Sequence, residues 1–459
     1  MILCQELPRG KAFFAACALP AGYAFYVTRF VLGFLILGPR VSATAIGAAV
    51  RSDPRHCGNV VRFLRRLPPG VRDDWLEAMF GNLLSDEPPT GTWVFILDQT
   101  YCGHNSSRLE NSYTTSPRGK RSKKANPKDK RKKRKKQPQS YCHCFVMGLL
   151  ITPTGVRLPI FKSYYTEEYS AKRGWKYRKQ TELAAQMIDG LRVPHGAKVV
   201  VLGDTAFDAE VVLAACRRRH FDWIVAMNGD RVLAGPTKDQ RSKVTQLVDG
   251  WSAADYVPIR LTPGEGRYQA QRRPAACRVG LRRKSREFWV HAEQLDMHNV
   301  GTVRVLYSTM QEPAAGQAVK VQKVLLTSDL GRNIEDIIEL YDLRWQIELF
   351  FKECKSTLGL NRYRFEDFDC VESWVSLCLL TFLYLEWYRV QQLRENTARP
   401  KERQRWQWQR CHGLALAVRQ DIEAADLLAL HDLLHAPEGV ERLKQQLRRA
   451  VRKEYRKVA

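Results

Sequence analysis

The chain has 459 residues, 44% of them apolar, so it is long enough for about three domains with hydrophobic cores, and disorder along its whole length is excluded. Its 74 Lys and Arg residues outnumber 48 Asp and Glu residues, and the resulting net charge of +26 favours a polyanionic partner. The 12 Cys residues lack the dense, regular spacing of a disulfide-stapled protein, which indicates a reducing compartment.

An apolar stretch near the N-terminus, residues 13–37, is long enough to span a bilayer. Pro20, Gly22, Arg29 and Gly33 interrupt it, and the first dozen residues contain neither a clear basic region nor a signal-peptide cleavage site. We therefore expect no membrane span and a cytoplasmic location, associated with the nucleoid if the host is a prokaryote.

Residues 1–90 have a helical pattern that is interrupted at residues 52–55 by Ser-Asp-Pro-Arg. Asp53 can cap, and Pro54 can open, the second of two short helices, which is typical of a helix-turn-helix DNA-binding motif. The second helix would then present three arginines to DNA: Arg62, Arg65 and Arg66. An ordinary helical hairpin explains the same pattern, so the positive charge of the chain is the main support for DNA binding here.

The pattern then changes to a mixture of strands and helices, which we predict to be a ribonuclease H-like core in two parts, residues 91–228 and 330–395. Three apolar strands, a helix, a strand, a helix and a strand follow one another, which is the order of ribonuclease H-like nucleases. These predicted elements are residues 93–97, 144–151, 158–161, 178–191, 198–203, 208–219 and 222–226.

Between the two parts, residues 229–329 lose the helical period and contain alternating β-rich segments, so we predict an inserted, largely antiparallel β region. The second part of the core ends in an intensely apolar helix, residues 371–390, which we expect to be buried against the sheet. Residues 396–459 are predicted to form a basic, helical C-terminal region. The predicted fold class is therefore α/β, with helical regions at both ends.

Residues 117–136 contain thirteen Lys and Arg residues and a single acid, Asp129, and so contribute +12 of the net charge. Like charges at this density do not fold on their own, so we expect a disordered hairpin tip between two strands. The tip would add sequence-independent affinity for DNA phosphates. A nuclear-localisation signal has the same composition, and the sequence does not separate the two.

Two aspartates follow apolar strands: Asp98 comes directly after residues 93–97, and Asp204 directly after residues 198–203. The carboxyl ends of strands are where α/β sheets bind ligands. Phosphoryl transfer from DNA needs two divalent ions held by bridging carboxylates, and these aspartates together with Glu348 would meet that need. Each aspartate also has a simpler explanation as a turn former or helix cap.

A continuous helix over residues 341–355 would place Tyr341, Arg344, Glu348 and Lys355 within about 60° on one face. Arg and Lys bind phosphates and a carboxylate binds a divalent ion, so this face suits a metal held against a nucleic-acid backbone. Glu353 lies about 140° from Glu348 and is expected to be exposed. A solvated helix face with i,i+4 charge pairs is the alternative.

The chain resembles the DDE transposases of the insertion-sequence-four group. These four residues match the signature of that group, Tyr-x2-Arg-x3-Glu-x6-Lys, at every position. Asp98 in Phe-Ile-Leu-Asp-Gln-Thr and Asp204 in Val-Leu-Gly-Asp-Thr-Ala look like the first two acids of the triad. The resemblance extends over residues 90–390. It implies that Asp98, Asp204 and Glu348 are catalytic and hold two Mg2+ ions, for which Mn2+ can substitute.

By the same resemblance, Arg344 and Lys355 would bind phosphates near the scissile bond, and Tyr341 would contact the DNA end. Members of this group commonly form a DNA hairpin at the element end, helped by an aromatic residue of the β insertion that stacks on a flipped base. Trp251 and Trp289 are the tryptophans available in that region, and burial in the sheet is the alternative for each.

The predicted function is cut-and-paste transposition, with metal-dependent cleavage at transposon ends and joining of the freed 3′-hydroxyls to target DNA by a synaptic homodimer. Two other functions use the same features: a domesticated DNA-binding protein without activity, and a stand-alone metal-dependent nuclease. The intact acid triad argues against the first, because a binding protein does not need three carboxylates at these spacings. An assay on paired DNA ends is needed to separate the second.

A structural zinc site is a further hypothesis, because Cys102 and His104 precede the basic run and Cys142 and Cys144 follow it. Spacing by two puts each pair on one face of its strand, and four such ligands could meet across the base of the hairpin. Burial of these cysteines as small hydrophobic side chains is the alternative.

Overall fold

The computed structural model describes residues 7–50, 56–104, 106–115, 140–227, 231–235, 242–244, 246–247, 251–262, 265–272, 285–315, 319–441, 444–445 and 448. The chain divides into two compact units. One consists of residues 86–351, and the other combines residues 1–85 with residues 352–459. The basic run at residues 117–136 and the predicted helix break at residues 52–55 lie outside the described residues.

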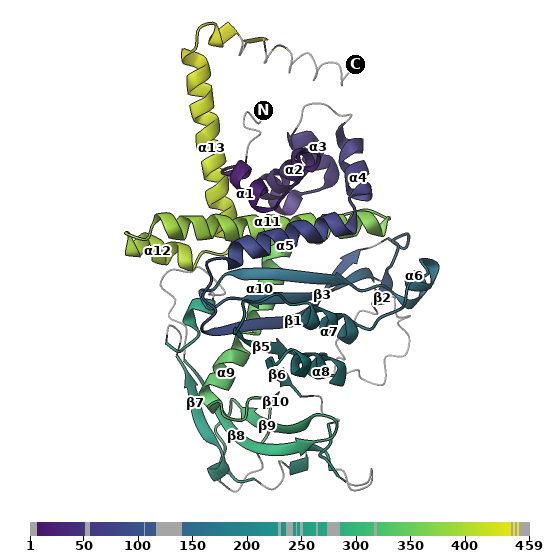
Figure 1. Ribbon diagram of the computed structural model, residues 1–459, viewed down its shortest axis with the longest axis vertical. Helices are drawn as coiled ribbons and strands as arrows, with labels where there is room; N and C mark the ends of the chain where they lie inside the picture. The colour runs from purple at the N-terminus through teal and green to yellow at the C-terminus, as the bar shows by residue number, and fades with distance from the viewer. Residues whose placement is uncertain are drawn as a thin grey trace, which may run out of the picture. The chain divides into compact units, whose positions relative to one another are not determined.

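A mixed sheet of ten strands, counted over the described residues, forms the centre of the unit of residues 86–351 (Figure 1). The strand order is β2-β3-β1-β5-β6-β10-β9-β8-β7, and β4 also pairs with β3. The strands are β1 Thr92–His104, β2 Tyr113–Thr115, β3 Ser140–Ile151, β4 Arg157–Ser163, β5 Lys198–Gly203, β6 Asp222–Ala226, β7 Val257–Leu261, β8 Arg286–Met297, β9 Gly301–Thr309 and β10 Lys323–Thr327.

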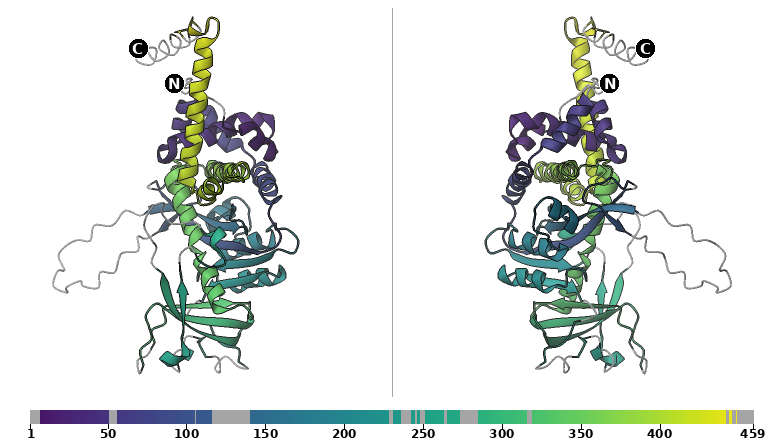
Figure 2. Two further views of the ribbon diagram at one scale, coloured as in Figure 1. Left: turned by 90° about the vertical axis from the view of Figure 1, so that its left-hand side faces the viewer. Right: turned by 90° about the vertical axis from the view of Figure 1, so that its right-hand side faces the viewer.

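The strand directions confirm the predicted fold class. Strand β3 pairs antiparallel with β4 on one side and with β1 on the other, whereas β5 runs parallel to β1 and β6 parallel to β5. Three antiparallel strands followed by two parallel ones are consistent with a ribonuclease H-like core. Strand β10 then pairs antiparallel with β6, and β9, β8 and β7 follow in the same manner, so the β region predicted at residues 229–329 continues the core sheet (Figure 2).

Helices of this unit pack on the sheet: α7 contacts β3 and β4, and α8 contacts β6. Helix α7 covers the face that bears Phe95 and Gly148, because a Cβ added to Gly148 would meet Phe95 and Met187 of α7. Asp98, three residues beyond Phe95 on β1, points to the opposite face, since side chains alternate along a strand. The helices are α6 Glu167–Lys172, α7 Gln180–Asp189, α8 Glu210–Arg218, α9 Ile334–Asp342 and α10 Trp345–Glu353.

The other unit is helical, as predicted for both ends of the chain. Its longest helix, α11, packs with α2, α4, α5, α12 and α13, and its N-terminus is capped by Asp367, which accepts from the N–H of Asp369 at 2.9 Å. The helices are α1 Gly10–Ala16, α2 Ala21–Leu37, α3 Ala43–Val50, α4 His56–Arg66, α5 Pro69–Leu84, α11 Phe368–Glu395, α12 Pro400–Gln407 and α13 Cys411–His435. The predicted burial of the apolar helix is confirmed, but its predicted packing against the sheet is not, because the main partners found for it are helices of its own unit.

Two helices among the described residues are long and apolar enough to cross a membrane, by length and composition: Gly22–Arg40 and Phe368–Glu395. In the second, 94% of the apolar window is buried inside the protein. Core helices of globular proteins have the same composition, and burial of this kind accounts for the apolar character of α11. In the first, 44% of the window is buried.

Candidate active site

Asp98 and Asp204 occupy equivalent positions along two neighbouring parallel strands. The pairing of β1 with β5 ends at Ile96 opposite Leu202, and each aspartate lies two residues further along the chain. Residues at the same level of a parallel pair point to the same face, so the register directs both side chains to one side of the sheet. The two carboxylates interact, because Asp204 contributes to raising the pKa of Asp98.

The strand that contains Asp98 was predicted to end at Leu97, and this is wrong. Strand β1 continues to His104, because its second half pairs with β3 over residues 98–104. Asp98 therefore lies inside a strand, at the point where the pairing with β5 stops. Asp204 does follow the end of its strand, as predicted, and its Oδ1 accepts from the N–H of Ala206 at 2.9 Å.

The continuous helix predicted for residues 341–355 is also wrong, because two helices and a π-helical turn share this segment. Helix α9 ends at Asp342, α10 begins at Trp345, and residues 354–358 form the π-helical turn. Arg344 lies at the junction, where its N–H donates to the carbonyl oxygen of Tyr341 at 3.0 Å. The angles calculated for a single helix therefore do not apply from Tyr341 to Lys355.

Arg344 nevertheless lies between two of the three candidate carboxylates. Its Nη2 donates to Glu348 Oε1 at 2.6 Å, and its Nη1 lies 3.8 Å from Asp98 Oδ2. Glu348 is half-buried on α10, and Arg344 and Asp98 are each largely sheltered from solvent. The guanidinium thus joins the carboxylate from the helix to the carboxylate from the sheet.

The environment of Asp98 differs from that of an ordinary surface carboxylate. Burial is the largest influence and, with the nearby carboxylates of Asp204 and Glu348, raises the pKa of Asp98 to about 6. The N–H of Gln99, which donates to Asp98 Oδ1 at 2.7 Å, and the guanidinium of Arg344 act in the opposite direction. A divalent cation would relieve this repulsion among acids, because it stabilises their ionised forms.

Tyr341 and Lys323 lie beside this group. Tyr341 is buried, which raises its pKa to about 12. The Lys323 ammonium lies 4.8 Å from the centre of the Tyr341 ring. Although Lys323 as a whole residue is exposed, partial burial of its ammonium lowers its pKa, and the nearby Arg344 acts in the same direction. Lys323 was not predicted from the sequence, because no short motif includes it and its place at the start of β10 was the only available signal.

The chemistry of these side chains fits a divalent cation, since three carboxylates supply the oxygen ligands that Mg2+ requires. Over the residues that the structure describes, however, no three His, Cys, Asp or Glu residues are grouped closely enough to hold a metal ion. We attribute this lack of grouping to the ion pair between Arg344 and Glu348, because the pair directs one oxygen of the Glu348 carboxylate to the guanidinium. Metal binding by all three acids would require Glu348 to exchange this partner.

The remaining predicted DNA-binding residues lie on other elements. Lys355 is half-buried in the π-helical turn and belongs to the helical unit. Trp289 is half-buried in β8, where it pairs with Pro258 of β7 and Thr309 of β9. Trp251 packs against His291 and Tyr307, with ring centres 4.1 and 4.2 Å away. Among the described residues, aromatic ring contacts are found for Trp251 and not for Trp289.

The three arginines predicted to face DNA all lie on the exposed side of α4: Arg62, Arg65 and Arg66. Helix α4 packs against α3, so the two helices of the predicted pair are present. The Nε of Arg65 lies 2.7 Å from Asp367 Oδ2, which ties one of these arginines to the start of α11.

Glu353 was expected to be exposed, and this is wrong. Its side chain is 3% exposed, and Oε1 accepts from Arg410 Nε at 2.5 Å. The continuous helix also predicted that Glu353 and Glu348 lie on different sides, and the two residues do have different surroundings. It points instead into the helical unit, where an arginine of the α12–α13 junction neutralises it.

The zinc hypothesis is contradicted by the strand register. Cys102 lies opposite His143, whereas Cys142 lies opposite Gly103 and Cys144 opposite Tyr101. Residues directly opposite in an antiparallel pair point to the same face, so Cys102 and His104 point away from the face of Cys142 and Cys144. The three cysteines are buried, as the alternative predicted, and no metal-binding group occurs in the described part of the chain.

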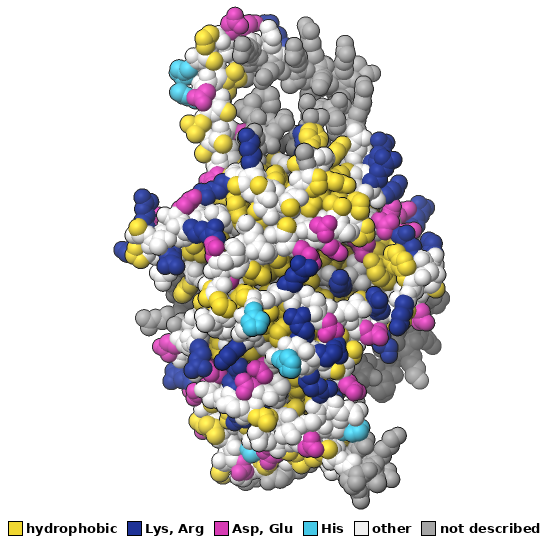
Figure 3. Space-filling model, viewed as in Figure 1, with side chains coloured by type: hydrophobic (Ala, Val, Ile, Leu, Met, Phe, Trp, Pro, Cys, Tyr) yellow, Lys and Arg dark blue, Asp and Glu magenta, His cyan; other side chains and the backbone are white. Residues whose placement is uncertain are grey.

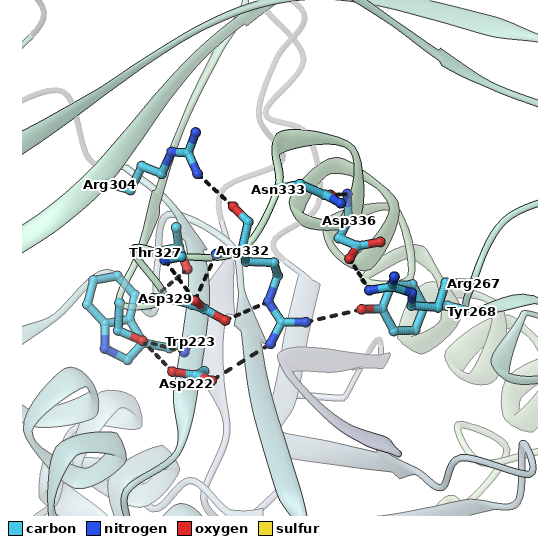
Figure 4. Close-up of polar contacts among 12 residues, drawn as sticks. Asp222, Trp223, Arg267, Tyr268, Arg304, Thr327, Asp329, Arg332, Asn333 and Asp336 are labelled. Carbon is cyan, nitrogen blue, oxygen red and sulfur yellow. Dashed lines mark hydrogen bonds and ion pairs between the residues drawn. The ribbon is translucent and has the colours of Figure 1, made fainter.

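A network around Arg332 fixes the start of α9, the helix that precedes the junction at Arg344 (Figure 4). Arg332 Nε donates to Asp329 Oδ2 at 2.8 Å, and Nη1 donates to the Tyr268 hydroxyl at 3.1 Å. The Asn333 side chain caps α9 by accepting from the N–H of Asp336 at 2.7 Å. Asp222 of β6 lies 3.8 Å from the same guanidinium, so the sheet and helix α9 are joined through one side chain.

Helix α9 also binds the loop at residues 265–272. Glu339, a buried residue, accepts hydrogen bonds from the N–H groups of Arg267 at 3.1 Å and Tyr268 at 3.0 Å. Asp342 Oδ1 lies 2.6 Å from Arg286 Nη2, and Asp342 Oδ2 lies 2.5 Å from Arg272 Nη1. The acidic side of α9 is therefore occupied by the β region, whereas Tyr341 faces the candidate site.

The fold is consistent with a ribonuclease H-like core, and the candidate site brings acidic and basic side chains together where the pairing of β1 with β5 stops. Residues 176–384 match the family model described as the transposase DDE domain. The match contains Asp204, Lys323, Arg344 and Glu348 and begins after Asp98. No curated protein matches the chain. The family match supports a transposase.

Proposed function

We propose that the protein is a DDE transposase of the cut-and-paste type, which cleaves DNA at the ends of a mobile element and joins the freed 3′-hydroxyls to a target. The main support is the geometry around Arg344, which lies within reach of Asp98 from the sheet and Glu348 from α10. Asp204 lies at the same level of the sheet as Asp98 and supplies the third carboxylate. The family match over residues 176–384 supports the same conclusion.

In this proposal Asp98, Asp204 and Glu348 would hold divalent ions, Mg2+ or Mn2+. When bound, such ions would supply an activated nucleophile and stabilise the leaving oxygen. Arg344 then releases Glu348 and binds a phosphate oxygen, because its planar guanidinium suits phosphate as well as carboxylate. Burial raises the pKa of the Tyr341 hydroxyl, and Arg344 beside it has the smaller, opposite effect. The partner is DNA, and a synaptic homodimer is proposed from the resemblance to DDE transposases.

The net charge of +26 supports DNA as the partner. On the face shown in Figure 3, Lys and Arg side chains are interspersed with Asp and Glu rather than gathered in one uniform patch. Residues 117–136 alone contribute +12 of the net +26. We therefore propose that this run adds nonspecific phosphate affinity, while the candidate site and α4 provide the specific contacts.

The test is an assay with linear DNA that ends in the inverted repeats flanking the gene, a supercoiled target plasmid and Mg2+. We expect cleavage at the repeat ends and covalent joining to the plasmid. Cleavage without joining would assign a stand-alone nuclease, and binding without either reaction would assign a domesticated DNA-binding protein. Omitting the metal should stop both reactions while the protein still binds the repeat DNA.

A further inference from the structure

Lys323 begins β10, and its position is set by the sheet. The residue pairs with Ser308 of β9, whose hydroxyl donates to the Lys323 carbonyl oxygen at 3.2 Å. From this fixed backbone the side chain extends until its ammonium lies 4.8 Å from the centre of the Tyr341 ring. A cation over an aromatic ring is attracted to it, so this contact holds the charge beside the candidate site.

The charges nearest this ammonium belong to the candidate site and its border. Arg344, Glu348, Asp342 and Asp204 all act on Lys323. Within the described ranges, however, no carboxylate oxygen lies within the 4.0 Å of an ion pair with Lys323. Arg344 is engaged by Glu348 at 2.6 Å, and Asp342 is engaged by two other arginines. Among the described residues, Lys323 is thus a positive charge near the acids that is held by an aromatic ring and not by a carboxylate.

We propose that Lys323 binds a DNA backbone phosphate at the active site, beside the carboxylates proposed to hold metal. This inference rests on the proposed function and adds a residue outside the Tyr-x2-Arg-x3-Glu-x6-Lys signature. An ammonium is a compact point charge with three donors, and it can bind one phosphate oxygen while remaining over the Tyr341 ring. Its partial exposure leaves it accessible to a ligand entering from solvent.

The experiment compares Lys323→Gln and Lys323→Arg with Lys320→Gln. Lys320 is an exposed lysine three residues earlier, and its substitution removes the same charge from the same segment. Binding to a fluorescent duplex that ends in the flanking inverted repeat is measured without metal over a range of salt concentrations. Matched circular dichroism spectra and thermal midpoints establish that the variants are folded.

We expect Lys323→Gln to weaken binding about tenfold to a hundredfold at low salt, as for loss of a charge-assisted contact. The slope of log affinity against log salt should fall by about 0.9, because one phosphate contact is lost. Lys323→Arg should restore the slope, and Lys320→Gln should leave it unchanged. Equal effects of Lys323→Gln and Lys320→Gln, or no effect of either on the slope, would overturn the assignment.

A second measurement locates the contact on DNA. Duplexes that carry a neutral methylphosphonate at one position near the repeat end are bound by wild-type protein and by Lys323→Gln. At the phosphate that Lys323 contacts, the neutral group should weaken wild-type binding yet cost the variant nothing further. Additive losses at every position tested would exclude a direct contact. If the wild-type protein binds the repeat end no better than unrelated DNA, the proposed function fails first and this inference with it.

Discussion

Glu353, five residues beyond Glu348, is buried and paired with Arg410, whose Nε donates to it at 2.5 Å. Truncation of Glu353 to Ala would leave the largely sheltered guanidinium of Arg410 without its carboxylate. Breaking a buried ion pair by removing one partner costs about 3–5 kcal/mol. We therefore expect Glu353→Ala to lower the urea midpoint of unfolding substantially.

The matched control for this prediction is the double variant Glu353→Met with Arg410→Met, which removes both charges at once. It should recover most of the lost stability, because a buried pair replaced by apolar side chains is often neutral. A Glu353→Ala protein as stable as wild type would contradict the burial of this pair.

The three candidate acids should each be indispensable for cleavage. Replacing Asp98, Asp204 or Glu348 by Ala removes one ligand for divalent metal and leaves the phosphate-binding side chains in place. We expect cleavage of repeat-end DNA to be abolished, with binding of that DNA in the absence of metal retained. Asp222→Ala serves as the control, since this carboxylate lies on neighbouring β6 and contacts Ser328 and Arg332 instead. Mg2+-dependent cleavage by any of the three variants would remove that residue from the site.

Arg344→Ala should damage the chemical step more than DNA binding. The substitution removes a guanidinium that contacts Glu348 and faces Asp98. A charge-assisted contact of about 1.5–3 kcal/mol that acts in the transition state corresponds to about ten- to a hundredfold in rate. Single-turnover cleavage at saturating enzyme would measure this loss apart from affinity. Arg304→Ala is a suitable control, because that guanidinium donates to a backbone carbonyl oxygen of Arg332. An equal rate for the two variants would exclude a special role for Arg344.

Deleting residues 117–136 should weaken binding to all DNA sequences alike. The deletion removes thirteen basic residues and one acid, and each lost phosphate contact reduces the salt slope by about 0.9. Preference for the repeat end over unrelated DNA should survive, since basic runs make no base contacts. An unchanged salt slope would leave nuclear localisation as the better explanation of this run.

Gly266→Ala should destabilise the contact between helix α9 and the loop at residues 265–272. Gly266 has φ +111°, and an added Cβ would overlap the carboxylate of Glu339. Gly301→Ala is the matched control, because Gly301 has φ +85° but open space around its Cβ position. The control should show only the backbone strain of about 1–3 kcal/mol. Gly266→Ala should cost roughly 1–3 kcal/mol more, as for an overpacked site. Equal midpoints of unfolding for the two variants would contradict the close approach of Glu339.

The sequence was sufficient to predict the parts of the fold that depend on local patterns. Apolar runs predicted the strands of the core and of residues 229–329, because burial on a sheet selects β-branched and aromatic residues over short distances. Strand β1 was predicted too short, since its second half is held by pairing with β3, a long-range contact without a local signal. The junction at Arg344 was missed for a similar reason, because residues 341–355 contain neither Gly nor Pro to mark a helix end.

The candidate site was predictable where a motif brings residues together within one segment, as for Arg344 and Glu348. That Asp98 and Asp204 lie at the same level of neighbouring strands could be expected only from the order of the strands in the sheet. The sequence indicated that order only through the succession of predicted strands and helices. Lys323 and the pair of Glu353 with Arg410 depend on residues far apart in the chain. No composition or spacing encodes such contacts, so they were visible only once the fold was known.

The pairing of β6 with β10 has a consequence for how this protein can vary. Trp223, Ile224 and Val225 are buried in β6, and one side of that strand is bonded to β10. A relative that lost residues 229–329 would present the open backbone of an apolar strand to other copies of the chain, which is the usual origin of edge-to-edge aggregation. Natural variation in this segment should therefore be confined to the turns between its strands, whereas β10 itself should persist in every functional descendant.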